Sequence, residues 1–265
     1  MKLENKKIVV TGAGSGIGKE LVLALLKKNN KVLAVDLRQE SLDALKTEVG
    51  ENENLTIHTL NVSDKTAVEK LASEQKDIDC LINNAGIIQP FVRVNDLDYD
   101  AIEKVMSVNF YGTLYMTKAF LPELLKRSEA YVANVSSMGG FLPVPGQSVY
   151  GASKAAIKLL TEGLYSELKD TKVGVSIVFP GATATNISKN SGVDTAHLSG
   201  GDLKKSSYKT LPASEAARLI IAGMEEDKFH IFLGSDSNFM NFLYSLSPQF
   251  ATNFIAKKMK SLLPK

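Results

Sequence analysis

The residues best suited to chemistry are Tyr150 and Lys154, four positions apart in the stretch SVYGASKAAIKLL. The apolar residues that follow recur at helical spacing, and positions i and i+4 share one face of a helix, so the phenol and the ammonium would stand side by side. Tyrosine has an ordinary pKa of about 10, and a nearby positive charge stabilises its phenolate. The pair could therefore move a proton at a hydroxyl or carbonyl oxygen. From this spacing alone, an ordinary exposed helical pair remains the alternative.

A glycine-rich turn near the N-terminus predicts a dinucleotide site. The stretch VVTGAGSGIGKELVLALL reads as strand, turn and helix, with Gly12, Gly16 and Gly18 in the turn. Glycines there allow a tight turn, approach of a pyrophosphate and close helix–strand contact, while free amides at the helix start face the phosphates. The spacing G-x-x-x-G-x-G departs from G-x-G-x-x-G, since Ile17 takes the last glycine position, and it is not a P-loop. Taken alone, the turn could be a simple tight connection.

Asp36 ends the second expected strand, 18 residues after Gly18. A carboxylate there can accept hydrogen bonds from both ribose hydroxyls of an adenosine and would repel a 2′-phosphate, which favours NAD over NADP. Arg38 keeps NADP open, because its guanidinium could bind a 2′-phosphate if it folded inward. The structural alternatives are a helix cap for Asp36 and a solvated loop charge for Arg38.

Strand-like and helical patterns alternate through most of the chain. The strand-like runs are nearly continuously apolar, as expected of parallel strands covered on both faces, and they span residues 7–12, 31–36, 55–60, 78–83, 130–137, 173–180 and 229–234. Repeated βα units predict an α/β fold with one doubly wound, Rossmann-like parallel sheet in a single domain over residues 1–238. Residues 182–212 lack periodicity and read as a lid or binding segment, and residues 239–265 form an apolar and basic tail.

Together, these motifs resemble the short-chain dehydrogenase/reductase family in its short single-domain form. The resemblance rests on TGAGSGIG at residues 11–18, NNAG at 83–86, Asn109 in VNFYGT, Ser137 in NVSSMGG, the pair in YGASK, and PGATAT at 180–185. Six motifs in the right order make chance agreement improbable. The resemblance implies a catalytic set of Asn109, Ser137, Tyr150 and Lys154. It also implies a cofactor-binding set, which is Gly12, Ser15, Gly16, Ile17, Gly18, Asp36, Asn61, Val62, Asn84, Ala85, Gly86, Tyr150, Lys154, Pro180, Gly181, Thr183 and Thr185.

The resemblance implies a role for each catalytic residue. Ser137, chosen over Ser136 for its separation from Tyr150, would hold the substrate oxygen near the phenol. Lys154 would lower the pKa of Tyr150 and grip the ribose, while Asn109 would hold a water that connects Lys154 to solvent. Ser136 should point to the opposite face of its strand. One departure from the family pattern, Asn61-Val62 in place of Asp-Val, affects only the adenine contacts.

The predicted function is hydride transfer between NAD(H) and a secondary alcohol or ketone. Apolar residues expected to flank the substrate favour an apolar one, although they could simply pack the loops; they are Ile87, Ile88, Phe91, Val92, Phe141, Leu142 and Val144. Two alternatives stay open: an NADP-dependent carbonyl reductase, and a redox sensor that binds dinucleotide without turnover. A binder needs no proton relay, so the intact set of Asn109, Ser137, Tyr150 and Lys154 argues against the sensor.

Composition excludes several classes of partner. The chain has 265 residues, a formal net charge of +2 and one cysteine, Cys80. The near-neutral charge gives no case for nucleic acid, and a single cysteine suits a reducing compartment. The first residues do not resemble a signal peptide and no apolar run could span a membrane, so we expect a cytoplasmic protein. The histidines His58, His197 and His230 are dispersed, so we expect no metal.

The tail allows more than one partner. Apolar residues recur at near-helical spacing, with lysines among them; the apolar ones are Phe250, Phe254, Ile255, Met259, Leu262 and Leu263, and the lysines are Lys257, Lys258, Lys260 and Lys265. Packing against the domain or a subunit interface is the preferred interpretation. Contact with an anionic membrane surface is the alternative. The family resemblance suggests a homodimer or homotetramer.

Overall fold

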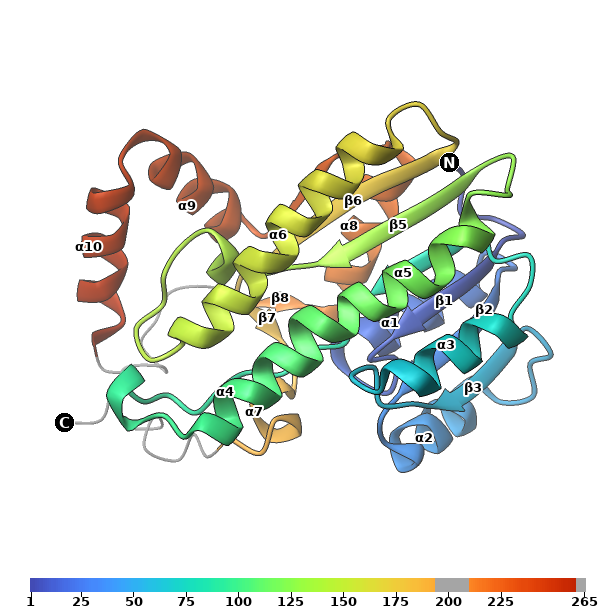
Figure 1. Cartoon of the computed structure of the whole chain (residues 1–265), viewed down its shortest axis with the longest axis horizontal. Helices are drawn as coiled ribbons and strands as arrows, with labels where there is room; N and C mark the ends of the chain where they lie inside the picture. The colour runs from blue at the N-terminus through green and yellow to red at the C-terminus, as the bar shows by residue number, and fades with distance from the viewer. Residues whose placement is uncertain (194–209, 261–265) are drawn as a thin grey trace.

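The computed structural model describes residues 1–193 and 210–260 and forms one doubly wound α/β domain (Figure 1). Its centre is a parallel seven-stranded sheet in the order β3-β2-β1-β4-β5-β6-β9. All seven expected strands are confirmed, and their bounds are β1 Lys7–Thr11, β2 Lys31–Asp36, β3 Leu55–Thr59, β4 Cys80–Asn83, β5 Ala130–Val135, β6 Val173–Pro180 and β9 His230–Leu233. A second, two-stranded sheet of β7 (Thr183–Ala184) and β8 (Leu211–Pro212) was not predicted.

Helices cover both faces of the large sheet (Figure 1). On one face, α1 (Gly16–Leu26), α2 (Gln39–Val49) and α8 (Ala213–Glu225) enclose one hydrophobic core. On the other, α3 (Lys65–Glu74), α5 (Gly112–Leu124) and α6 (Ser148–Leu168) enclose a second. Successive side chains of one strand pack into the cores on opposite faces of the sheet: Ile8 and Val10 of β1 belong to the first core and Val9 to the second. This double burial explains the continuous apolar runs in the sequence.

The chain reverses its direction of winding between β1 and β4. After β3, at one edge of the sheet, it returns to place β4 beside β1, with Val9 opposite Leu81. In sheets of this kind, a crevice opens beyond the carboxyl ends of the strands at that switch point. The fold therefore brings the segments that follow β1, β2, β4, β5 and β6 to one edge.

The remaining elements lie around that edge and at one end of the molecule. Near the edge lie α4 (Tyr99–Met106), a π-helical turn at Ser107–Tyr111, and the short α7 (Ile187–Asn190). Two further helices, α9 (Ser235–Leu246) and α10 (Pro248–Lys258), form the left-hand end in Figure 1. No helix in residues 1–193 and 210–260 combines the length and hydropathy needed to cross a bilayer.

Some predictions fall outside the described residues. They concern His197 and residues 194–209 of the segment 182–212 that was expected to form a lid or binding segment. They also concern Leu262, Leu263 and Lys265 at the end of the tail.

Candidate active site

The glycine-rich turn joins β1 to α1 with its backbone exposed to a cleft. Gly12 and Gly16 have φ angles of 64° and 55°, in the left-handed region that favours glycine. An added Cβ at Gly18 would lie 2.0 Å from the carbonyl oxygen of Gly12, so only glycine allows this helix to lie so close to the strand. The N-cap residue of α1, Ser15, makes no side-chain cap. The first amides of α1 are thus available to an anion, which fits the pyrophosphate of a dinucleotide.

Asp36 lies beside this turn, at the end of β2. The residue is 9% exposed, and its carboxylate accepts hydrogen bonds from the backbone amides of Gly14 (2.9 Å) and Arg38 (3.1 Å). The side chain of Arg38 instead reaches across the cleft and donates to Asn190 Oδ1 (2.9 Å). The carboxylate is therefore held in place at the cleft wall, while the guanidinium is engaged by α7.

The NNAG segment fastens the turn to β4. The side chain of Asn84 donates to the carbonyls of Thr11 (3.0 Å) and Gly12 (3.3 Å). The hydroxyl of Thr11 accepts from the amides of Asn84 and Ala85, both at 3.0 Å. Asn83 is buried and donates to two buried side chains below the cleft. Asn83 and Asn84 thus organise hydrogen bonds of the sheet and loop, as expected from the sequence.

Tyr150 and Lys154 lie one turn apart on α6, as their spacing predicted. The Lys154 Nζ lies 5.9 Å from the centre of the Tyr150 ring and donates to the carbonyl of Val135 (3.0 Å). Ser137 and Ser136 face different surroundings. Both residues line the cleft, but Ser137 Oγ accepts from the amide of Gly139, whereas Ser136 is almost fully buried and its Oγ donates to the carbonyl of Lys154 (2.7 Å).

The pKa of Tyr150 differs from the expectation. Lys154 was expected to lower it, but burial raises the pKa of the phenol above its ordinary value, and the hydroxyl of Ser137 opposes that rise. Burial also lowers the pKa of Lys154 from 10.5 to about 8. The cause is desolvation, which disfavours whichever form of a group is charged. Near neutral pH the protein alone therefore presents a protonated phenol beside a mostly protonated amine.

Asn109 lies behind the cleft wall, in the π-helical turn between α4 and α5. Its Oδ1 accepts from the amide of Ile87 (2.9 Å), and its Nδ2 donates to the carbonyl of Ile87 and to Ser153 Oγ (2.9 Å). The side chain thus ties the loop after β4 to α6, and protein groups engage both of its polar atoms. Its implied role of holding a water stays a prediction. π-Helical turns often occur at functional sites, but no pattern in the sequence predicted this one.

Gln89 is a positioning residue that the sequence analysis missed. It is fully buried in the loop after β4, and its Oε1 accepts from the amides of Val149 (2.8 Å) and Tyr150 (3.0 Å). Its Nε2 donates to the carbonyl of Gly146 (2.9 Å), and its own carbonyl accepts from Gln147 (2.8 Å). The N-cap of α6 has no side-chain cap of its own. Gln89 supplies the missing acceptor from about 60 residues away.

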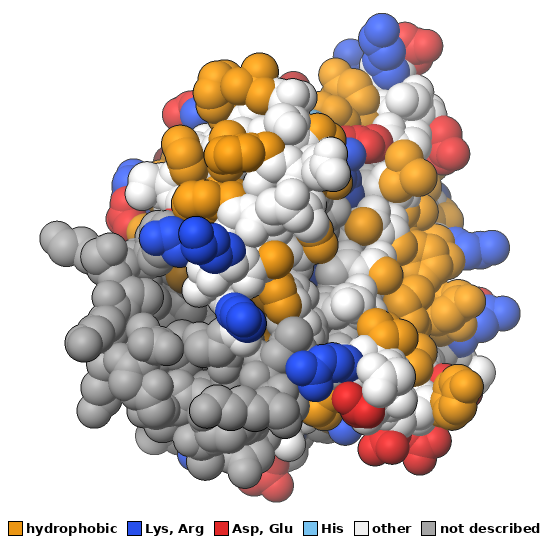
Figure 2. Space-filling view, turned by 90° about the vertical axis from the view of Figure 1, so that its left-hand side faces the viewer, with side chains coloured by type: hydrophobic (Ala, Val, Ile, Leu, Met, Phe, Trp, Pro, Cys, Tyr) orange, Lys and Arg blue, Asp and Glu red, His pale blue; other side chains and the backbone are white. Residues whose placement is uncertain are grey.

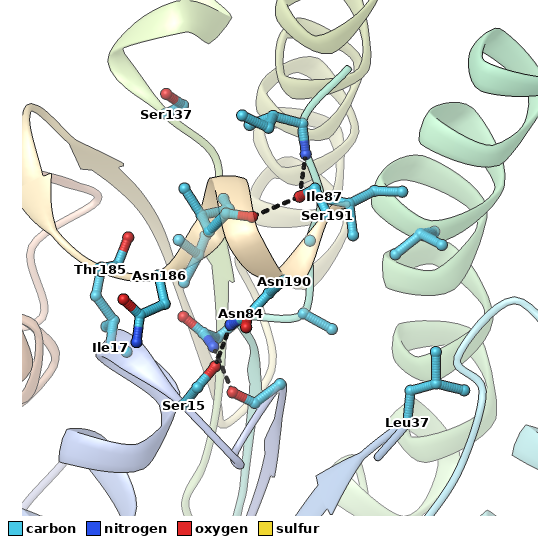
Figure 3. Close-up of a pocket in the computed structure, with 18 of the residues that line it drawn as sticks. Ser15, Ile17, Leu37, Asn84, Ile87, Ser137, Thr185, Asn186, Asn190 and Ser191 are labelled. Atoms are coloured by element: carbon cyan, nitrogen blue, oxygen red, sulfur yellow. Dashed lines mark hydrogen bonds between the residues drawn. The ribbon is translucent and has the colours of Figure 1, made fainter. Parts of the chain in front are cut away.

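The short helix α7 crosses the glycine-rich turn (Figure 3). Asn190 lies above Ser15 and donates to its Oγ (2.8 Å), so that one side chain links Ser15 to Arg38. Ser191 accepts from the amide of Ile88 (3.0 Å). The sequence indicated a binding segment here but gave no signal for these two residues.

The cleft brings together most of the residues predicted from the sequence. Ser137, Tyr150 and Lys154 line it, and so do all the predicted cofactor-binding residues except Gly18, which lies behind the wall as Asn109 does. Those that line it are Gly12, Ser15, Gly16, Ile17, Asp36, Asn61, Val62, Asn84, Ala85, Gly86, Tyr150, Lys154, Pro180, Gly181, Thr183 and Thr185. Backbone donors, a fixed carboxylate and a lysine thus occur in one cleft, and these groups fit a nicotinamide dinucleotide.

Only two of the seven residues expected to form apolar walls, Ile87 and Ile88, line the cleft, and Phe91, Val92 and Val144 are not among its lining residues. Leu142 is fully buried in a cluster with α9 and α10, and Phe141 packs edge-on against Phe179. The loop after Ser137 therefore contributes mainly to packing against the tail.

Known proteins resemble this chain along most of its length. A profile of the family described as short chain dehydrogenase matches residues 6–196. A 3-ketodihydrosphingosine reductase of Dictyostelium discoideum is 33% identical over 261 residues, which cover 87% of this chain and 75% of that protein.

Solved structures agree. A short chain dehydrogenase from Burkholderia cenocepacia in complex with NADP has a TM-score of 0.81 and 28% identity, covering 96% of this chain and 99% of that one. A short chain dehydrogenase/reductase from Burkholderia phymatum in complex with NAD has a TM-score of 0.77 and 25% identity, covering 88% and 90%.

Proposed function

Because the chain belongs to the short-chain dehydrogenase/reductase family of NAD(P)-dependent oxidoreductases acting on CH–OH groups, we propose that it interconverts an apolar ketone and its secondary alcohol, with Tyr150 as general acid and base. The observation that carries this proposal is the shared cleft of Ser137, Tyr150 and Lys154 with the glycine-rich turn. Proton transfer at oxygen and dinucleotide binding can thus occur in one place.

Each side chain has a defined task in this proposal. Ser137 Oγ donates to the substrate oxygen and holds it near the phenol. In reduction, Tyr150 gives its proton to the carbonyl oxygen as carbon receives the hydride that the bound dinucleotide supplies. In oxidation, the phenolate takes the hydroxyl proton. Lys154, which is charged below a pKa of about 8, stabilises the phenolate left after reduction.

The raised pKa of Tyr150 bears on the general-acid step of ketone reduction. A phenol whose pKa lies above its ordinary value stays protonated near neutral pH, and the protonated form is the one that a general acid needs. Oxidation needs the phenolate, so its rate should increase with pH.

For the cofactor, we infer NAD rather than NADP. The carboxylate of Asp36 is fixed at the cleft wall by two backbone amides, where it would repel a 2′-phosphate. Arg38, the residue that would favour NADP, is engaged by Asn190. An NADP-dependent carbonyl reductase is the second candidate, and both NAD and NADP occur in related structures.

A fluorescence titration with NADH and NADPH tests this preference. We expect NADH to bind more tightly than NADPH. Asp36→Ala should reduce the ratio of the two dissociation constants about ten-fold, which corresponds to the loss of about 1.4 kcal/mol of electrostatic repulsion of the 2′-phosphate. Arg38→Ala serves as the matched variant and should leave the NADH preference in place. Tighter NADPH binding, lost in Arg38→Ala, would instead support the carbonyl reductase.

For the substrate, we propose a ketone or alcohol with an apolar chain or ring. Ile87 and Ile88 give an apolar wall to the cleft that also contains Tyr150. The relative named 3-ketodihydrosphingosine reductase is consistent with a ketone substrate. A kinetic series of ketones should show kcat/KM increasing with apolar chain length; preference for small polyols would contradict the proposal.

Replacement of Tyr150 by Phe tests the central role. An enzyme should lose most of its turnover while its dinucleotide affinity stays within about two-fold, because the hydroxyl serves proton transfer rather than binding. Tyr165→Phe is the matched control on the same helix, where the tyrosine is exposed. A redox sensor without turnover would show no substrate-dependent oxidation of NADH in either variant or in the native protein.

A further inference from the structure

The helices α9 and α10 carry apolar side chains on two faces. The inner face packs on the domain, where Met240, Ala251 and Ile255 form a cluster with Leu142. The outer face is different. Phe239, Phe242, Leu246 and Phe250 are 56%, 62%, 68% and 57% exposed, respectively.

We call these four exposed residues the outer stripe; three belong to α9 and one to α10. The first three are spaced three and four residues apart, so they share a face of α9. Phe250 lies in the first turn of α10, and its ring stacks on that of Phe254 at 6.5 Å between centres. Figure 2 faces this end of the molecule and shows hydrophobic side chains gathered at its top, with Lys and Arg side chains below. So large an exposed aromatic surface usually marks an interaction site.

The charge of the tail has a single sign. From Ser237 to the last residue the sequence contains four lysines and no aspartate or glutamate. Lys257 and Lys258 lie in the last turn of α10, and the Nζ of Lys258 lies 5.8 Å from the centre of the Phe254 ring. Neither lysine forms an ion pair with a carboxylate among the described residues. The positive charges therefore lie on the same helix as Phe250 of the outer stripe, about two turns further along, and are available to an anionic partner.

We propose that the outer stripe and the lysines of α10 bind the surface of an anionic lipid bilayer. Aromatic side chains are well suited to the headgroup region, and a helix with an apolar face and flanking lysines can lie in that interface. Anionic lipid would compensate the lysines, which face no described carboxylate. A second copy of the chain fits less well, because a two-fold contact through this face would bring a second tail that has no aspartate or glutamate to compensate the lysines.

The inner face gives this contact a consequence for catalysis. Met138 and Phe141, which pack against the tail, follow Ser137 in the loop at the cleft. A protein docked through α9 and α10 would therefore hold this loop near the lipid surface, from which an apolar substrate could enter. This consequence rests on the proposed function, whereas the docking itself does not.

Co-sedimentation of the full-length protein with vesicles tests the docking. We expect binding to phosphatidylcholine vesicles that contain about 30% phosphatidylglycerol, and at least ten-fold weaker binding to pure phosphatidylcholine. Binding should weaken as salt is raised from about 0.05 to about 0.5 M, because salt screens the lysines. Equal binding to both vesicle types, or none to either, would overturn the proposal.

Three variants locate the contact. Phe242→Glu with Leu246→Glu should reduce vesicle binding at least ten-fold, and Lys257→Glu with Lys258→Glu should remove the preference for anionic lipid. Leu125→Glu is the matched control, because Leu125 is a 48% exposed leucine that follows α5, away from the tail. Equal loss of binding in the control would overturn the proposal.

Two further measurements separate docking from other effects. Turnover of a water-soluble ketone should be the same in Phe242→Glu with Leu246→Glu as in the native protein, and this result would show that the variant folds. If the native protein itself has no turnover, the proposed function is wrong, but the vesicle-binding results can still be interpreted. Sedimentation velocity is the second measurement. If Phe242→Glu with Leu246→Glu separates a dimer into monomers and the native protein does not bind vesicles, the face is a subunit interface and the proposal is wrong.

Discussion

The cap that Gln89 places on α6 can be tested by replacing it with leucine, which keeps the bulk but removes the carboxamide. Three backbone groups would lose their partners: the amides of Val149 and Tyr150 and the carbonyl of Gly146. A buried polar group without a partner costs about 1–3 kcal/mol. Because Val149 and Tyr150 are only partly buried, we take about 1 kcal/mol for each group, or about 3 kcal/mol in all.

This loss should appear both in stability and in turnover. For a domain of this size, 1 kcal/mol shifts the Tm by about 2–4 °C, so Gln89→Leu should melt about 6–12 °C lower. The first turn of α6 carries Tyr150, and small displacements of a reacting group can greatly reduce rate, so kcat should fall about ten-fold. The affinity for NADH should change little, because Gln89 does not line the cleft.

Thermal melting by circular dichroism and steady-state kinetics measure the two effects. Gln249→Leu, at an exposed glutamine of α10, is the matched control and should leave both Tm and kcat unchanged. A Tm within about 2 °C of the native protein would refute the assigned cost of the cap. A lower Tm with unchanged kcat would show that the cap stabilises α6 without positioning Tyr150.

Three other predictions follow from single contacts or charges. Gly18→Ala should abolish dinucleotide binding and lower the yield of folded protein, because the new Cβ would lie 2.0 Å from the carbonyl oxygen of Gly12. Fluorescence titration measures the dinucleotide affinity and thermal melting measures the stability. An affinity like that of the native protein would contradict the prediction. For ketone reduction, kcat/KM should be constant below neutral pH and should fall as the pH rises through about 8. The reason is that Lys154 loses its charge in this range while the Tyr150 phenol stays protonated. A pH profile of kcat/KM that stays flat to high pH would show that the charge of Lys154 is not needed. Asn190→Ala should raise the dinucleotide Kd several-fold, because it removes the hydrogen bond from α7 to Ser15 of the glycine-rich turn. A fluorescence titration measures this Kd. An unchanged Kd would show that the hydrogen bond does not contribute to dinucleotide binding.

Features that depend on neighbouring residues could be predicted from the sequence. The seven strands were correct because each is a short apolar run bounded by turn residues. The spacing of Tyr150 and Lys154 placed both on one helical face, and the glycines required the turn between β1 and α1. In each case the signal and the structure lie within one segment.

Features that depend on distant segments could not be predicted. Gln89 caps a helix about 60 residues later in the chain, and a buried glutamine in a loop has no pattern that names its partner. The pKa of Tyr150 is set by desolvation, which arises only when the surrounding loops assemble. The tail showed apolar periodicity, but only the packing of Met240 and Ile255 separates its covered face from its exposed one.

The loop after β4 joins the dinucleotide side of the cleft to the proton donor. At one end, Asn84 holds the glycine-rich turn. At the other, Gln89 caps α6, and between them Asn109 ties Ile87 to Ser153, whose hydroxyl in turn donates to the carbonyl of Tyr150 (2.7 Å). Binding at the turn and the position of the phenol therefore share a single short segment. The loop therefore sets where the phenol lies relative to the glycine-rich turn, which is the relation that hydride and proton transfer to one substrate requires.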